Sequence, residues 1–138
     1  MKTYFVDTGY WLARSDSSDQ LHVRAVAVSK KFGTDTHLVI TELVLVEWLN
    51  ATARFGVAAR QELVRQIIRM ENADDIMVVP QNEYIFRSSL HEYSHYADKD
   101  WSFTDITSFH VMRSRNIRDA LIYDRHFEQA GFRALLRD

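Results

Sequence analysis

The chain has 138 residues and no cysteine, and its 17 basic and 19 acidic residues give a formal net charge of −2. This length favours a single domain over residues 1–138, with a hydrophobic core of its own. Disulfides and thiolate metal sites are excluded, and the overall positive charge typical of nucleic-acid-binding proteins is absent. No stretch has the ~20 apolar residues of a membrane span, and the start MKTYFVDTGYW is no signal peptide, so we expect a cytoplasmic protein without a membrane segment.

The first 33 residues predict one strand followed by two helices. The run Lys2–Val6 predicts a short strand that ends on Asp7, and Asp7 can serve as the N-cap of a short helix over residues 8–13. An amphipathic pattern over residues 19–32 predicts a second helix, which we expect to stop at Gly33.

The next segment predicts a strand and an unusually apolar helix. Residues 37–40 predict the strand, and Thr41 is a good N-cap for a helix over residues 42–54. Apolar side chains occur all round this helix, which is typical of a largely buried helix. Glu47 lies in its middle, and a buried carboxylate requires a cation, a proton or a partner. The alternative is that Glu47 belongs to a narrow exposed stripe.

The middle of the chain predicts two helices separated by a strand. Residues 57–70 predict an amphipathic helix whose row of arginines is either a solvated surface or a track for phosphates. Residues 75–80 predict a strand that ends at the only proline, and residues 82–96 predict the second helix.

That second helix contains the sequence His91-Glu92-Tyr93-Ser94-His95, which matches the H-E-x-x-H pattern of zinc peptidases. Two histidines one helical turn apart can hold Zn²⁺, but a third ligand is needed. No glycine lies between His95 and Gly131, and no glutamate lies between Glu92 and Glu128, so the usual sources of that ligand are missing. We therefore expect surface or partly buried histidines rather than a peptidase site.

The C-terminal part predicts a helix, a strand and a short helix. Ser102 and Asp105 have the spacing of a capping box, and an amphipathic run follows them. Residues 120–123 predict a strand that ends on Asp124, and the short helix after it stops at Gly131.

With a last edge strand predicted over residues 133–136, strands and helices alternate along the chain. This order indicates an α/β fold with three layers, α/β/α, in which helices cover both faces of a parallel central sheet.

Four acidic residues are expected at one rim of that sheet. The carboxyl ends of parallel strands and the amino ends of their crossover helices meet there, and ligands bind there. Asp7 and Asp124 end strands, Asp105 lies in the first turn of a helix, and Glu47 lies about one and a half turns into another. Converging carboxylates raise one another's pKa, a conflict that a hard divalent ion removes. The residues therefore predict a Mg²⁺ or Mn²⁺ site able to activate water for phosphodiester hydrolysis.

The C-terminal pattern resembles that of PIN-domain ribonucleases, and most closely that of the VapC-like toxins of toxin–antitoxin pairs. Its most specific part is S-x-x-D, a helix, a strand and D-x-H-F-x-x-x-G-F, which runs from Ser102 to Phe132. The piece from Thr41 to Glu47, at a strand–helix junction, and the pair Asp7-Thr8 after a strand also match.

The resemblance implies a Mg²⁺-dependent endoribonuclease, with Mn²⁺ as a possible substitute, that cuts single-stranded RNA and leaves 5′-phosphate and 3′-hydroxyl ends. It also implies a cognate antitoxin as partner and a homodimer. Apolar residues of the early helices add to the expectation of a homodimer, and they include Tyr10, Trp11, Leu12, Val44 and Trp48.

The resemblance assigns catalytic and metal-binding roles to Asp7, Glu47, Asp105 and Asp124, with Asp7 and Asp105 as the first direct ligands. Thr8 and Ser102 match the small hydroxyl residues that support the family's site, Ser102 by orienting Asp105.

Two neighbours of the acids bear on the substrate. Arg125 and His126 follow Asp124 and could contact a phosphate, and the bulky Trp48 departs from the family pattern beside Glu47, where it bears on substrate access. The main alternative function is a non-catalytic nucleic-acid- or partner-binding module of the same fold, whose acids only cap helices.

Overall fold

The computed structural model describes residues 2–137, which form five strands and seven α-helices. The strands are β1 (Lys2–Val6), β2 (Thr36–Thr41), β3 (Ile76–Val79), β4 (Asp119–Leu121) and β5 (Arg133–Ala134). The helices are α1 (Thr8–Ser15), α2 (His22–Ser29), α3 (Glu42–Thr52), α4 (Val57–Asn72), α5 (Glu83–His95), α6 (Phe103–Ser114) and α7 (Arg125–Gln129), and the 3₁₀ turn η1 (Ala53–Phe55) joins α3 to α4. None of the helices within the described residues is long and apolar enough to cross a membrane.

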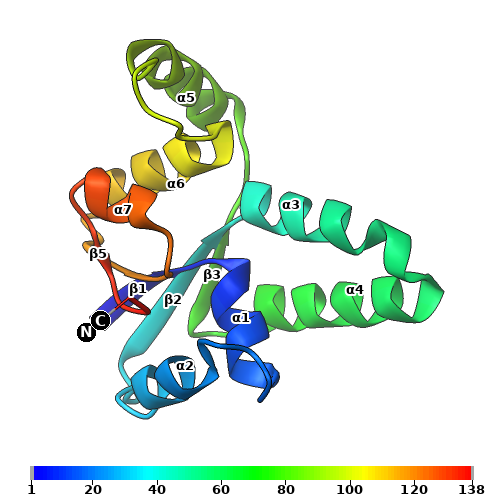
Figure 1. The fold of residues 1–138 in the computed structure, drawn as a ribbon. Helices are drawn as coiled ribbons and strands as arrows, with labels where there is room; N and C mark the ends of the chain where they lie inside the picture. Colours follow the sequence, from blue (N-terminus) through cyan, green and yellow to red (C-terminus); the bar gives the residue numbers. More distant parts are fainter. Residues whose placement is uncertain (1, 138) are drawn as a thin grey trace.

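The strands form one parallel sheet in the order β3-β2-β1-β4-β5 (Figure 1), which confirms the predicted parallel sheet. The edge strand predicted over residues 133–136 is present as β5 but is shorter than predicted. The central strand is β1, in which Phe5 pairs with Val39 of β2 on one side and Ala120 of β4 on the other.

Two apolar cores lie on the two faces of the sheet. Side chains alternate along a strand, so Phe5 and Val39 face one core and Tyr4 and Leu38 face the other. Helices α3 to α7 contribute to the first core, and α1 and α2 to the second. The predicted three-layer α/β/α architecture is therefore confirmed.

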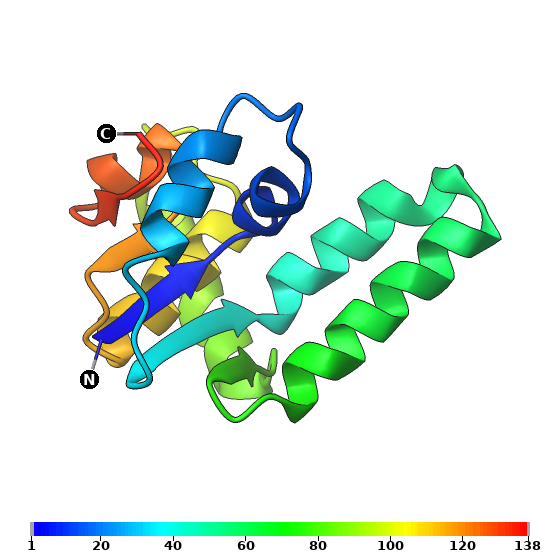
Figure 2. The same cartoon turned by 90° about the horizontal axis from the view of Figure 1, so that it is seen from below.

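Helices α3 and α4 form a hairpin that projects from the body of the molecule (Figure 1, Figure 2). Gly56 begins α4 with a φ of 92°, a conformation that other residues rarely adopt. The expectation that the helix over residues 42–54 is largely buried is wrong for its outer side, where Val46 and Leu49 are 41% and 38% exposed. The exposed-stripe alternative holds instead for Glu47, which is exposed to solvent together with Asn50 and Arg54.

Two predicted boundaries are also wrong. The helix expected over residues 19–32 is shortened to α2, because the Asp19 carboxylate accepts a hydrogen bond from the Leu21 backbone N–H (2.8 Å) in a turn before the helix. The strand expected over residues 120–123 corresponds to β4, which begins one residue earlier and ends two residues earlier. Its pairing with β1 runs from Asp119, opposite Tyr4, to Leu121, opposite Val6.

Some apolar residues expected to serve a partner are buried within the single chain. Tyr10, Val44 and Trp48 pack in the two cores, so they offer no surface for a second copy. Leu12 remains 49% exposed. The expected partner surface therefore has to be sought elsewhere on the molecule.

Candidate metal centre

Two of the four predicted acids follow strands at the carboxyl-terminal rim of the sheet. Asp7 follows β1 and caps α1, and its Oδ1 accepts hydrogen bonds from the backbone N–H (2.8 Å) and the hydroxyl (3.1 Å) of Thr8. Asp124 lies beyond β4 and caps α7, where its Oδ1 accepts a hydrogen bond from the His126 backbone N–H (2.9 Å). Both acids cap helices, and both also lie on the rim where parallel sheets bind ligands.

The third acid, Asp105, takes part in the predicted capping box at the start of α6. The Asp105 backbone N–H donates to Ser102 Oγ (3.0 Å), and the Ser102 backbone N–H donates to Asp105 Oδ2 (3.1 Å). The first bond caps the helix, and the second holds the Asp105 carboxylate against the helix start.

The fourth acid, Glu47, reaches the rim from α3, and the Thr104 hydroxyl donates a hydrogen bond to its Oε2 (2.7 Å). Thr104 is a site residue that the sequence reasoning missed, because the S-x-x-D spacing draws attention to the caps and not to the residues between them. Trp48 is buried in the core, so the predicted effect of its bulk on substrate access is wrong.

The four acids line a single pocket of about 280 Å³. Three apolar side chains from β1, α3 and α7 also line it, together with polar residues of α6, its cap and α7, and with a fifth acid from the loop before α6: Phe5, Val44, Phe127, Ser102, Thr104, Ser108, His126 and Asp100. Thr8 does not line the pocket and acts only through its hydrogen bonds to Asp7. Arg125, which we considered for phosphate contact, is exposed and lies outside this lining.

The electrostatics of the pocket favour a bound cation. Burial raises the pKa of the Asp7 carboxyl above its ordinary value, the hydrogen bonds from Thr8 lower it, and the charges of Glu47 and Asp105 raise it further. A divalent ion would offset this repulsion, and carboxylate oxygens are the ligands that Mg²⁺ and Mn²⁺ take in proteins. The residues present therefore fit a divalent metal ion.

A histidine completes the acidic group. His126 Nδ1 lies 3.0 Å from Asp105 Oδ2 and 3.4 Å from Asp124 Oδ1. Asp105, Asp124 and His126 each place one ligand atom within 4.8 Å of the others. The sequence signal for His126 is its place in the D-x-H-F pattern, two residues after Asp124, and the role predicted from it is a phosphate contact.

The H-E-x-x-H sequence on α5 does not assemble a zinc site among the described residues. His95 Nδ1 is 2.8 Å from the His91 carbonyl oxygen, and Glu92 lies on another side of the helix, 3.6 Å from His110 Nδ1. Within residues 2–137, no third acidic or histidine side chain joins His91 and His95 in a group that could hold a metal.

The row of arginines on α4 behaves as a solvated surface. Arg65 and Arg69 form exposed ion pairs with Glu62, at 2.9 Å and 3.5 Å. Such surface pairs contribute little to stability and need no ligand to explain them.

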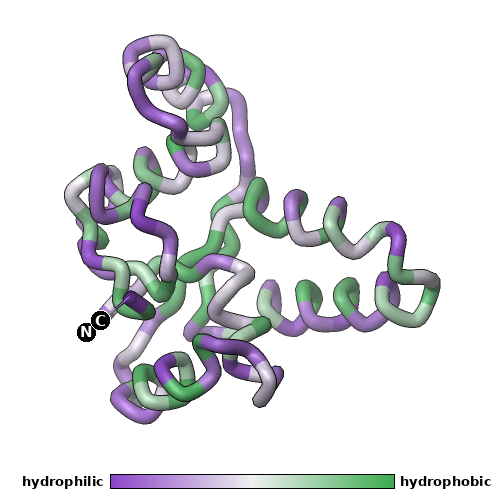
Figure 3. The backbone as a smooth tube through the Cα atoms, viewed as in Figure 1, coloured by the Kyte–Doolittle hydropathy of each residue, from purple (hydrophilic) through white to green (hydrophobic). Residues whose placement is uncertain are grey.

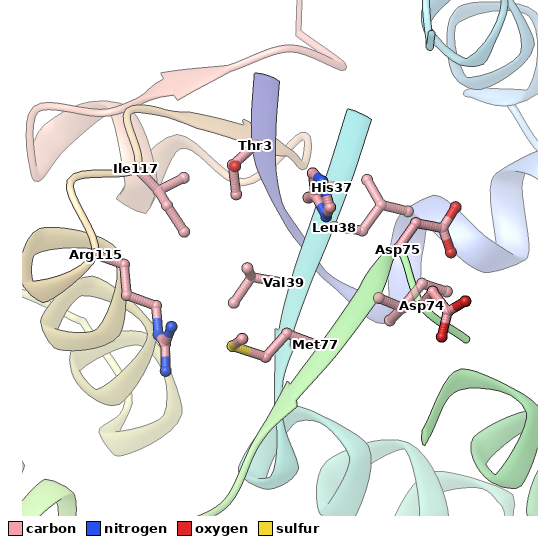
Figure 4. A pocket seen from close by; sticks show the side chains of 10 residues that line it. Thr3, His37, Leu38, Val39, Asp74, Asp75, Met77, Arg115 and Ile117 are labelled. Carbon is pink, nitrogen blue, oxygen red and sulfur yellow. The ribbon is translucent and has the colours of Figure 1, made fainter. Parts of the chain in front are cut away.

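A larger hollow of about 450 Å³ lies at the opposite, amino-terminal end of the strands. Figure 4 shows Arg115 on one side of it and Asp74 and Asp75 on the other, with Val39 and Met77 between them. None of the four predicted acids lines this hollow, so its size does not make it the candidate metal centre.

Comparisons with known proteins agree with the fold. No family model matches the chain. The chain is 31% identical over 134 residues to the 23S rRNA-specific endonuclease VapC20 of Mycobacterium tuberculosis, from strains CDC 1551 / Oshkosh and ATCC 25618 / H37Rv, with 93% of this chain and 94% of the relative covered. The crystal structure of Mycobacterium tuberculosis VapC20, described as a sarcin–ricin loop cleaving toxin, is similar with a TM-score of 0.77 and 25% identity, covering 94% of this chain and 95% of that chain.

Proposed function

The chain belongs to the VapC-like family of PIN-domain ribonucleases, and we propose that it is a Mg²⁺-dependent endoribonuclease that hydrolyses phosphodiester bonds of single-stranded RNA. The observation that supports this proposal best is the convergence of Asp7, Glu47, Asp105 and Asp124 on one pocket in a chain of this family. Mn²⁺ can substitute for Mg²⁺, because it accepts the same oxygen ligands.

Each acid has a role that follows from how it is held. Asp7, fixed by Thr8, and Asp105, fixed by Ser102, are the direct ligands. Glu47 and Asp124 complete the shell, directly or through water. A divalent ion bound there supplies an activated water and offsets charge on the phosphate during cleavage.

The remaining side chains orient the reaction. The Thr104 hydroxyl holds Glu47, and the start of α7 holds Asp124, so both carboxylates are in place to orient an attacking water. Attack of that water on phosphorus, with departure of the 3′ oxygen, leaves 5′-phosphate and 3′-hydroxyl ends.

The substrate class we propose is an exposed loop of ribosomal RNA. VapC20, the relative found by both comparisons, carries the descriptions 23S rRNA-specific endonuclease and sarcin–ricin loop cleaving toxin. A loop presents unstacked nucleotides that a protein can reach, whereas the base edges of a paired A-form helix are largely inaccessible in its deep groove. The sarcin–ricin loop is therefore the first RNA to test.

The partners we propose are a second copy of the chain and a cognate antitoxin, with the toxin acting in the cytoplasm, where ribosomes are found. The α3–α4 hairpin is the proposed surface for the second copy, because it projects from the body and carries apolar segments on both helices (Figure 3). Large apolar side chains on it are exposed to solvent: Val46, Leu49, Phe55, Val57, Val64 and Ile68.

The test is cleavage of two RNAs by the purified protein, a sarcin–ricin loop oligonucleotide and an unstructured single strand. We expect cleavage with Mg²⁺ or Mn²⁺, no cleavage with a chelator, and a 5′-phosphate on the downstream product. Binding of either RNA without cleavage in the presence of both ions would instead support the non-catalytic module. Cleavage that persists in the chelator would exclude the metal-dependent mechanism.

A further inference from the structure

His126 holds a place in the acidic pocket that helix capping does not explain. Its imidazole comes from the first turn of α7, is 27% exposed, and lines the same pocket as the four acids. Its Nδ1 is directed at two carboxylate oxygens from different elements, Asp105 Oδ2 at 3.0 Å and Asp124 Oδ1 at 3.4 Å. A nitrogen donor therefore stands among the oxygen donors of the proposed metal site.

These separations match those of neighbouring ligands on a single ion. Octahedral coordination with bonds of about 2.1 Å places adjacent donor atoms about 3 Å apart. The backbone of His126 is also held at the site, because its N–H donates to Asp124 Oδ1 (2.9 Å) and ties the residue to one of the acids. Little movement of the side chain is then needed for ligation.

We propose that His126 is a nitrogen ligand of the divalent ion, beside Asp105 and Asp124, and that it makes the site bind Mn²⁺ more tightly than Mg²⁺. This inference rests on the proposed function, because it concerns the same metal site. Mg²⁺ binds oxygen ligands and dehydrates reluctantly, whereas imidazole nitrogen favours the transition metals. The ion preference should therefore depend on this one side chain, while Mg²⁺ at higher concentration can still occupy the site.

The competing role for His126 is that of a positioning residue. In that case its Nδ1–H only donates a hydrogen bond to Asp105, and the ion has an all-oxygen shell. Both roles would reduce cleavage when the histidine is replaced, so activity does not separate them. The identity of the atoms bound to the ion does.

Electron spin-echo modulation of Mn²⁺ bound to the full-length protein detects such atoms directly. We expect ¹⁴N modulation typical of an imidazole ligand, which changes on labelling with ¹⁵N-histidine and disappears in His126→Asn. The matched control is His95→Asn, an exposed histidine outside the pocket, which should keep the modulation. The Mn²⁺ affinity of His126→Asn should fall about 10-fold or more, while its Mg²⁺ affinity changes by no more than about 2-fold.

Stoichiometric Mn²⁺ in the wild-type protein without ¹⁴N modulation would overturn the proposal and leave His126 as a positioning residue. Equal losses of Mn²⁺ and Mg²⁺ affinity in His126→Asn would also overturn it. In either case, RNA cleavage that still depends on the ion leaves the proposed function standing. Failure of the wild-type protein to bind either ion, together with absence of cleavage, would overturn both.

Discussion

At the scale of single residues, Asp7 shows the electrostatic conflict that the proposed metal ion would resolve. Burial raises the pKa of its carboxyl, and the nearby charges of Glu47 and Asp105 add to that effect. The folded protein therefore holds the Asp7 proton more tightly than the unfolded chain does. Linkage then requires the ionised carboxyl to destabilise the metal-free fold at pH values above its raised pKa.

Asp7→Asn should accordingly raise the free energy of unfolding of the metal-free protein near neutral pH. Asparagine still offers an oxygen to the Thr8 backbone N–H, so the cap survives. The gain should shrink as the pH falls through the raised pKa towards the ordinary range for aspartate, about 3.9, because Asp7 is then protonated in both states. Urea unfolding of both proteins in a chelator, from about pH 7 to about pH 4, measures this difference in their free energies of unfolding.

The matched control is Asp98→Asn, which alters an exposed acid 3.9 Å from Lys99 and should show no such pH-dependent gain. If Asp7→Asn is less stable than the wild-type protein near pH 7, or if the difference in stability does not depend on pH, the ionised Asp7 carboxyl does not destabilise the metal-free fold.

At the scale of elements, the same cap chemistry occurs inside and outside the site. Ser102 caps α6 and holds Asp105, whereas Asn82 caps α5 by accepting a hydrogen bond from the Ile85 backbone N–H (2.8 Å). Asn82 does not line the acidic pocket. A comparison of variants at the two caps therefore distinguishes the contribution of a helix cap to stability from its contribution to the acidic pocket.

Ser102→Ala and Asn82→Ala should each reduce the free energy of unfolding by about 1 kcal/mol, since each removes one N-cap acceptor. Only Ser102→Ala should also slow RNA cleavage, because Asp105 loses part of its support. Urea unfolding in a chelator and initial cleavage rates with Mg²⁺ measure the two effects. Equal cleavage by both variants would show that the capping box does not position Asp105.

The elements themselves were largely predictable from sequence, for local reasons. Asp7, Thr41, Asn82, Ser102 and Asp124 are residues that commonly cap helices, and each one begins a helix in the structure. The misplaced boundaries depend on tertiary context instead. A strand ends where its neighbour stops pairing, as β4 does opposite the end of β1, and no local pattern encodes that limit.

The predicted meeting of the four acids on one rim follows from topology, and the pocket confirms that geometry. The cross-element contacts were not predictable in the same way. Thr104 reaches Glu47 across 57 positions of sequence, and His126 reaches Asp105 across 21. The exposure of Glu47 was also uncertain, because an apolar helix on a projecting hairpin has the same composition as one inside a core.

At the scale of the whole molecule, the hairpin and the sheet rim serve different proposed purposes. The rim gathers the acids, while α3 and α4 extend away from the body (Figure 2). Several large apolar side chains on these two helices are exposed to solvent. Contiguous exposed apolar surface commonly marks an interaction site.

Replacement of Val64 and Ile68 by glutamate should disrupt the proposed homodimer. Both side chains are about half exposed and lie one turn apart on α4, so the monomer should still fold. Sedimentation velocity near 1 µM, where typical interfaces begin to dissociate, should show a dimer for the wild-type chain and a monomer for the double variant. Val23→Glu, an exposed position on α2, is the control and should leave the dimer intact. A wild-type monomer at that concentration would contradict the dimer.

The central claim is that the acids on the rim hold a divalent ion, and the effect of Mg²⁺ on the stability of Asp105→Asn tests it most directly. Asparagine keeps the size of the side chain and an oxygen for the Ser102 backbone N–H, while it removes one charge from the crowded pocket. In a chelator the variant should melt at the same temperature as the wild-type protein or slightly higher. With millimolar Mg²⁺ the wild-type protein should gain stability, about 2.7 kcal/mol when the ion is at 100 times its Kd, because an ion that binds only the folded state stabilises it. The variant should gain much less, and its cleavage of RNA should fall by orders of magnitude. An equal Mg²⁺ response in both proteins, with cleavage retained by the variant, would show that Asp105 only caps a helix.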